Sequence, residues 1–160
     1  MTDAVAIEDA PLTSPDARAL IARLNAELDE RYPEPGANFF QLDPDEVAPG
    51  RGAFVIARQA GIAIACGGVR LLAEVTPPTA EVKRMFVDPA ARGRGIARRV
   101  LEVLTERARS LGARRLVLET GARQPEALAL YAGAGFQKVE PFGEYVGSPQ
   151  SVCMAMDLDA

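Results

Sequence analysis

The sequence predicts an α/β (α+β) fold in which helices flank one mixed central sheet. Segments with apolar or alternating strand patterns outnumber helical segments, and they occur both as hairpins and as β-α-β steps, which requires antiparallel and parallel pairs together. The 160 residues, 48% of them hydrophobic and 25% charged, suffice for one core without metal or disulfide support. We therefore expect residues 1–160 to form a single domain.

The N-terminal half is expected to hold one helix, a loop and several strands. The helix begins at Ser14-Pro15, where Ser caps the first turn and Pro fits it, and it runs up to Pro33. Residues 33–52 are rich in Pro, Gly and Asp, which predicts a loop with a short helix. Strands are predicted at Ala4–Glu8, Ala53–Arg58, Ile62–Leu72 and Glu81–Val87, the middle two forming a hairpin.

The C-terminal half contains the clearest helical pattern, over residues 94–111, which Gly112 ends at the expected position. A second helix begins at Pro125 and ends around Gly133–Gly135. The apolar stripe of the first helix consists of Ile96, Val100, Val103, Leu104, Ala108 and Leu111. Strands are predicted at Leu116–Thr120, Phe136–Val139 and Ser151–Leu158.

The composition excludes several kinds of site. The chain has no histidine, which removes His-dependent triads, His-ligated zinc sites and an imidazole base. The two cysteines, Cys66 and Cys153, form no CxxC pair, so we expect free thiols and no metal site. No apolar run of membrane-spanning length and no signal pattern occurs, so we expect a cytoplasmic protein without membrane contact.

Charge is distributed unevenly along the chain. The net charge of −4 argues against nucleic-acid binding. Residues 1–50 carry 3 basic and 11 acidic groups (−8), residues 51–100 carry 9 and 3 (+6), and residues 101–160 carry 6 and 8 (−2). A basic middle third in an acidic protein indicates a local site for an anion.

The residues that lead from the strand at Val87 into the long helix have the features of a phosphate site. Gly93 and Gly95 allow close backbone approach, and the first helical turn leaves N–H donors unpaired at the positive end of the helix dipole. Charge that could reach further phosphates comes from Arg92, Arg94, Arg98 and Arg99. The alternative is a plain loop followed by a solvated basic helix face.

The motif itself decides among phosphate ligands. A Rossmann fingerprint needs a third glycine where Arg98 stands, and no P-loop motif occurs. The stretch fits [RQ]xxGx[GA] as Arg92-x-x-Gly95-x-Ala97, and it resembles the pyrophosphate-binding motif of the GNAT N-acetyltransferases, which use acetyl-coenzyme A. The strand Leu116–Thr120, the helix from Gln124-Pro125 to Tyr131, and Gly135-Phe136 are similar to the second half of the family pattern.

The resemblance implies a sheet whose strands ending at Val87 and beginning at Leu116 splay apart, with pantetheine in the gap as an extra strand. Residues 1–52 would then form the acceptor side and residues 53–160 the coenzyme-binding core. Gln124 stands where the family often has Asn. The implied coenzyme contacts are Phe86, Val87, Arg92, Gly93, Arg94, Gly95, Ile96, Ala97, Arg98, Gln124 and Ala127.

Two kinds of catalytic group are expected. A phenol can protonate the thiolate that leaves a thioester, and the resemblance gives this role to Tyr131; the alternative is core packing against Ala127 and Leu128. Without histidine, the base that deprotonates an ammonium is a carboxylate or a water chain. Glu81 ranks first, from the strand position of the catalytic glutamate in histone-acetylating members, and Glu119 ranks second. Each could equally be paired to Lys83 or Arg115.

The strand pair Lys83-Arg84 is unusual because central strands rarely carry charge. Adjacent strand residues face opposite sides, so only one of the two is expected to face an acceptor cleft. Arg84 or Arg70 would clamp a substrate carboxylate, or Arg84 would form a salt bridge to Glu74 or Glu119. Aromatic residues that wall the acceptor pocket, or are plain core, are Phe39-Phe40, Phe142 and Tyr145.

Taken together, these features predict an enzyme that transfers acetyl from acetyl-CoA to the primary amine of a small molecule, by direct attack in a ternary complex. A small acceptor is favoured because no acidic cluster in the catalytic half would hold a polybasic peptide. The alternatives are a non-catalytic coenzyme-A-binding module, a protein N-acetyltransferase and a nucleotide-dependent enzyme. The resemblance also makes a homodimer an expectation.

Overall fold

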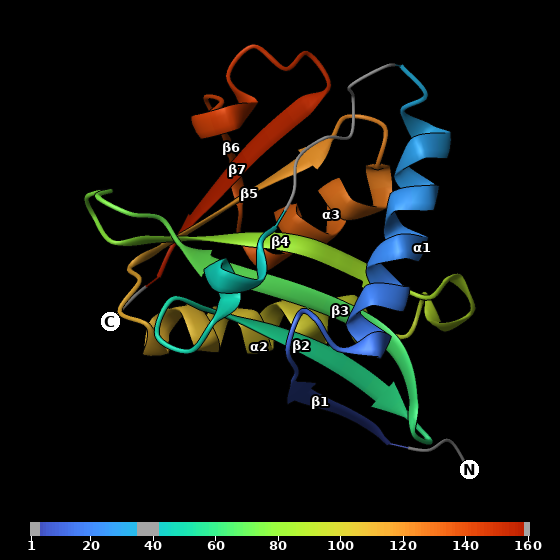
Figure 1. The fold of residues 1–160 in the computed structure, drawn as a ribbon. Coiled ribbons are helices and arrows are strands. Elements are labelled where there is room, and N and C mark those ends of the chain that lie inside the picture. Colours follow the sequence, from blue (N-terminus) through green and yellow to red (C-terminus); the bar gives the residue numbers. More distant parts are fainter. Residues whose placement is uncertain (1–3, 35–41, 159–160) are drawn as a thin grey trace.

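The computed structural model describes residues 4–34 and 42–158. Seven strands form one sheet in the order β1-β2-β3-β4-β5-β7-β6 (Figure 1). Among the strand pairs of these described residues only β4–β5 is parallel, so the predicted mixed sheet is confirmed. The strands are β1 Val5–Asp9, β2 Gly52–Gln59, β3 Ile62–Leu71, β4 Thr79–Val87, β5 Arg115–Gly121, β6 Gln137–Val139 and β7 Ser151–Asp157.

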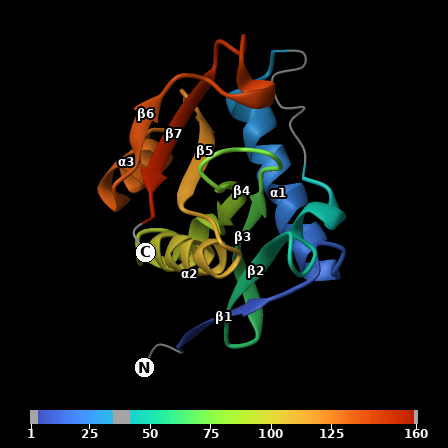
Figure 2. The ribbon, with the colours of Figure 1, turned by 90° about the vertical axis from the view of Figure 1, so that its left-hand side faces the viewer.

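Three α-helices cover the two faces of the sheet. Figure 2 shows α1 on one side of the sheet, and α2 and α3 on the other. None of the helices in the described part of the chain is long and apolar enough to cross a membrane. The helices are α1 Pro15–Arg31, α2 Ile96–Ser110 and α3 Pro125–Ala134, and the 3-10 turns are η1 Pro44–Val47, η2 Pro89–Ala91 and η3 Gly143–Tyr145.

Local sequence explains where the helices begin and what they bury. The Ser14 side chain accepts a hydrogen bond from the Ala17 amide (3.3 Å) and Pro15 opens α1, as predicted. Four of the six predicted stripe residues, Ile96, Val100, Leu104 and Ala108, are buried; Val103 and Leu111 are only partly buried, and the unpredicted Leu101 is 2% exposed. The wide buried face of α2 packs on the sheet opposite α1.

The two parallel strands separate halfway along their length. Pairing between β4 and β5 begins at Thr79–Arg115 and ends at Val82–Leu118, although the strands continue to Val87 and Gly121. Beyond Val82, β4 therefore has β3 on one side and a gap on the other. Backbone groups at a strand edge can hydrogen bond an added strand, so the gap is a natural place for an extended ligand.

Candidate active site

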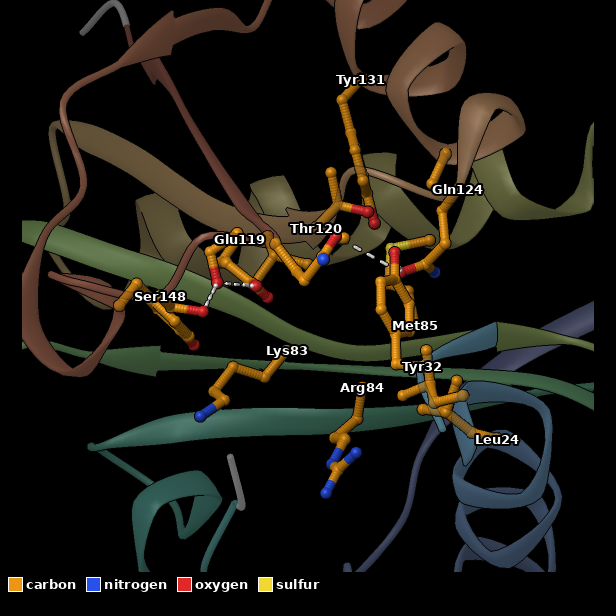
Figure 3. Close-up of a pocket in the computed structure, with 17 residues that line it drawn as sticks. Leu24, Tyr32, Lys83, Arg84, Met85, Glu119, Thr120, Gln124, Tyr131 and Ser148 are labelled. Atoms are coloured by element: carbon orange, nitrogen blue, oxygen red, sulfur yellow. Dashed lines mark hydrogen bonds between the residues drawn. The ribbon is translucent and has the colours of Figure 1, made fainter. Parts of the chain in front are cut away.

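A groove and a central cavity meet in the gap between β4 and β5. The groove, of about 300 Å³, runs along Phe86, Val87 and the N-terminus of α2. The central cavity, of about 150 Å³, lies between α1, the middle of β4 and the C-terminal end of β5 (Figure 3). Residues that line both are Leu24, Met85, Gln124, Ala127 and Tyr131.

The groove ends at a row of unpaired backbone donors. Within the described residues, the N–H groups of residues 93–98 have no hydrogen-bond acceptor, and the first bond of α2 runs from the Arg99 N–H to the Gly95 carbonyl (3.2 Å). Gly93 and Gly95 adopt left-handed conformations (φ 82° and 76°), which only glycine takes without strain. The Arg92 amide, in contrast, donates to the Pro89 carbonyl (3.3 Å). These donors at the positive end of a helix suit a phosphate group.

Two of the four arginines of this segment lie at the groove, and two do not. Arg92 donates to the Val87 carbonyl (2.9 Å) and to Glu27 (2.7 Å), and Arg98 also lines the groove. The Arg94 side chain reaches Gln59 (3.1 Å), and that of Arg99 reaches the carbonyl of Val5 on β1 (3.1 Å). The side chains of Arg94 and Arg99 thus lie against β2 and β1 here, away from the groove, and their contact with a ligand stays a prediction.

Gln124 lies where the groove and the cavity join. Its side-chain oxygen accepts a hydrogen bond from the Gly121 amide (3.1 Å) and one from the Tyr32 hydroxyl (3.5 Å), so it is held inside the gap. Tyr32, at the end of α1, accepts a hydrogen bond from the Arg123 amide (2.8 Å). The end of α1 is thereby fastened to the turn between β5 and α3.

Tyr131 points from α3 into the same junction (Figure 3). The residue is 7% exposed, and its ring packs edge-on against Phe136 with centroids 5.8 Å apart. No group in the described part of the chain hydrogen bonds its hydroxyl. Burial raises the pKa of this phenol, with a smaller contribution from Glu119, so the hydroxyl keeps its proton and can donate it.

The two candidate carboxylates differ in availability. Glu81 is 1% exposed; one oxygen accepts from Arg70 (2.8 and 3.0 Å) and the other from the Tyr145 hydroxyl (2.6 Å). Its partner is thus Arg70, not the Lys83 or Arg115 considered from the sequence. Glu119 lines the central cavity, whereas Glu81 lines a second cavity of about 500 Å³. The geometry favours Glu119 as the group that meets a substrate.

Glu119 has one oxygen that is held and one that is available. Its Oε2 accepts a hydrogen bond from the Ser151 hydroxyl (2.6 Å), and Oε1 has no hydrogen bond from a described residue. Burial raises the pKa of Glu119 above that of an ordinary glutamate, while the Ser151 hydroxyl opposes this shift. A carboxylate with a raised pKa is a stronger proton acceptor once it is ionised.

Arg70 and Tyr145 are part of a network around Glu81. Arg70 also forms an ion pair with Glu46 on η1 and lies 3.7 Å from Glu144 on η3. Tyr145 lines both cavities and packs edge-on against Phe142 (5.3 Å). The Arg70 guanidinium is therefore engaged by carboxylates of the protein itself. The predicted wall residues Phe39-Phe40 lie outside the described residues.

A β-bulge in β4 changes the direction of two cations. Lys83 pairs with Gly68 and Phe86 with Cys66, so two residues of β4 face the single Gly67 of β3. Arg84 in this bulge has φ 60°. Both Lys83 and Arg84 line the central cavity, and Figure 3 shows their side chains on the same side of β4. The prediction that only one of the two faces the cleft is wrong, because the bulge interrupts strand alternation.

These cations are held at the cavity wall by polar partners. Lys83 lies 4.0 Å from Glu144, and Arg84 donates to the Asn25 side chain of α1 (3.0 Å). Neither contact is the Glu74 or Glu119 pairing considered from the sequence. Burial lowers the pKa of both Lys83 and Arg84. The cavity thus places positive charge on the side of α1 and η3.

Comparison with known proteins identifies the family. The model of the acetyltransferase (GNAT) family matches residues 17–136. A protein named IAA acetyltransferase, from Azospirillum brasilense, is 38% identical over 139 residues, which cover 87% of this chain and 88% of that protein. The chain belongs to the GNAT acetyltransferase family. It is therefore an acetyl-CoA-dependent acyltransferase, and the non-catalytic alternative is set aside.

Solved structures agree with this assignment. A Klebsiella pneumoniae structure, named for the acyl-CoA N-acyltransferases, has a TM-score of 0.80 and 32% identity, covering 97% of this chain and 98% of that one. A GNAT family acetyltransferase from Elizabethkingia anophelis with acetyl-CoA bound has a TM-score of 0.64 and 19% identity, covering 96% and 98%. The latter shows the shared fold. In this GNAT enzyme the unpaired amides of residues 93–98 and the open edge of β4 fit the coenzyme's pyrophosphate and its amide-containing arm.

Three residues of the site were missed in the sequence. Tyr32, Ser148 and Ser151 line the central cavity, but each lies far from the GNAT motifs along the chain. Ser148 lies in a segment whose Gly, Ser and Pro predict only a turn, and Ser151 is predicted, and found, as the first residue of a strand, which says nothing of its partner. The antiparallel register of β5 and β7, which brings Ser151 near Glu119, is a tertiary feature without a local signal.

The phosphate assignment predicts a selective loss in a Gly95→Leu variant. No atom lies within 4 Å of the position that a Cβ on Gly95 would occupy, so the new side chain would enter the groove. We expect coenzyme A affinity, measured by titration calorimetry, to fall at least about tenfold. Gly112→Leu is the control, because Gly112 is also left-handed (φ 91°) and open but lies at the other end of α2. Equal affinities in both variants would contradict the assignment.

Proposed function

We propose that this GNAT enzyme acetylates the primary amine of a small molecule that also carries a carboxylate, by direct attack in a ternary complex. The observation that carries this proposal is the bulge that aims Lys83 and Arg84 at the central cavity. A carboxylate on the acceptor would meet these cations while its amine approaches Glu119. Residues 1–52, through α1, would supply part of the acceptor wall.

The proton movements follow from two side chains. Glu119 would take a proton from the acceptor ammonium, directly or through one water, because its Oε1 is available to the cavity. The amine, once neutral, is the nucleophile, and no covalent enzyme intermediate is needed. Both cysteines are buried, and burial raises the pKa of both thiols, to about 12 for Cys66, which makes them poor nucleophiles.

The leaving group would be met by Tyr131. Acetyl-CoA supplies an activated acetyl group whose thiolate departs on transfer. The Tyr131 hydroxyl faces the junction of groove and cavity and keeps its proton at working pH, so it can donate that proton or a hydrogen bond to the sulfur. Gln124 would hold the coenzyme arm at the same junction.

The size and charge of the cavity support a small anionic acceptor. A volume of about 150 Å³ holds a small amine, and the nearby cations would repel a polybasic peptide. Arg70, the other carboxylate ligand considered from the sequence, is engaged by Glu46, Glu81 and Glu144 and is not among the lining residues of the central cavity, whereas Lys83 and Arg84 line it. The positive charge of Lys83 and Arg84 at the cavity would favour amino-acid-like acceptors over neutral or cationic amines.

A thiol-release assay with acetyl-CoA tests the proposal. Amino acids are compared with the matched amines that lack the carboxylate, and with short peptides that have a free N-terminus. We expect turnover with at least one amino acid and a kcat/KM at least about tenfold lower for its matched amine. Turnover confined to peptides or to neutral amines would contradict the assignment of the acceptor, though not the family.

A further inference from the structure

We propose that Ser151, with Ser148 behind it, is a positioning residue that orients the Glu119 carboxylate toward the acceptor amine and keeps it ionised. This inference rests on the proposed role of Glu119. It assigns a function to the first residue of β7 and to the loop before it, which the family motifs do not include.

The serines form a directed hydrogen-bond chain. Ser151 Oγ lies 2.6 Å from Glu119 Oε2 and 2.9 Å from Ser148 Oγ. An ionised carboxylate only accepts hydrogen bonds, so the single Ser151 proton must point to Glu119. Ser148 then donates to Ser151. The chain therefore has one direction, from Ser148 to Ser151 to Glu119, as long as Glu119 is charged.

The fold fixes this arrangement on both sides. In the β5–β7 ladder Glu119 pairs with Cys153, so Ser151, two residues earlier, is its diagonal neighbour on the same face. The Ser151 amide donates to the Ser148 carbonyl (3.2 Å), which closes a turn and sets the second hydroxyl beside the first. With Oε2 held in this way, Oε1 is left toward the cavity.

The other charged groups near Glu119 also affect its pKa, and the hydrogen bond from Ser151 acts against those that raise it. Glu81 on β4 and Glu144 on η3 raise the pKa of Glu119 in addition to burial, and Lys83 on β4 lowers it. On the other packed elements, the Glu119 charge raises the pKa of Tyr32, Tyr131, Tyr145 and Cys153. Ser151 is the neutral donor in this set, and it stabilises the charged form without adding a charge of its own.

The test is an NMR titration of the Glu119 side-chain carboxyl carbon in the coenzyme-free protein, with Glu119→Gln used to assign the signal. We expect Ser151→Ala to raise the pKa of Glu119 by about one unit, because a hydrogen bond to the ionised form is lost. Ser151→Thr, which keeps the hydroxyl, should restore the wild-type value. Identical titration curves for wild type and Ser151→Ala would overturn the proposal.

The pH profile of turnover separates this inference from the proposed function. With acetyl-CoA and the best acceptor of the panel, Ser151→Ala should move the acid limb of kcat/KM upward by the same amount, and Ser148→Ala should move it less. If Glu119→Gln is inactive but the pH profile of Ser151→Ala matches that of the wild type, the positioning role of Ser151 is rejected and the role of Glu119 as the base stands. A fully active Glu119→Gln would reject the base itself, and the positioning role with it.

Discussion

Tyr131→Phe should reduce kcat at least about tenfold while leaving coenzyme A affinity nearly unchanged. The variant loses only the hydroxyl that faces the junction of the groove and the central cavity, and it keeps the ring that packs against Phe136. Without a proton donor, the thiolate must leave unassisted. The measurement is steady-state turnover by thiol release, with affinity taken from titration calorimetry.

The controls for Tyr131→Phe follow from its burial. Because no described residue hydrogen bonds the hydroxyl, its removal should not lower the melting temperature appreciably. The pKa of this phenol is raised, so wild-type kcat should show no loss from phenol ionisation between about pH 7 and pH 9. Equal turnover of the variant and the wild type would rule out the acid role.

Glu119→Gln should lower kcat/KM by about a hundredfold at neutral pH. The amide has the shape of the carboxylate and can keep a hydrogen bond with Ser151, but it cannot accept the ammonium proton. In the wild type, activity should fall as pH drops through the raised pKa of Glu119, because the protonated carboxyl is no longer a base. A profile of kcat/KM against pH measures both effects.

The loss in Glu119→Gln should shrink at high pH. There the acceptor amine loses its proton to water, so a base on the protein matters less. A purely structural defect would persist at every pH. Glu81→Gln is the comparison: its two oxygens are held by Arg70 and Tyr145, so we expect lower stability and a smaller change in rate. The reverse ranking of the two variants would show that Glu81 is the base.

Local sequence patterns predict much of the fold. Pro15 and Pro125 open their helices, Gly112 and Gly135 follow helix ends, and the strand boundaries agree with the prediction to within a few residues. The phosphate loop was also predictable, because two glycines before an amphipathic helix dictate unpaired donors. Local conformation and hydrophobic period were sufficient for these features.

The parts that could not be predicted depend on contacts between distant segments. The sequence ranked Glu81 above Glu119, but Arg70 from β3 and Tyr145 from η3 converge on Glu81 only in the folded chain. No glycine in β4 predicts the bulge at Arg84. The bulge interrupts the alternation of side-chain directions that a regular strand has. Side-chain partners of this kind are a property of the sheet, not of any one strand.

A crystal structure of the enzyme with coenzyme A bound is the most direct test of the account. We expect pyrophosphate oxygens within hydrogen-bonding distance of the amides of residues 93–98, and the coenzyme arm beside Phe86 and Val87 with its sulfur near the Tyr131 hydroxyl. A coenzyme whose pyrophosphate lies elsewhere, with the start of α2 still unpaired, would contradict it.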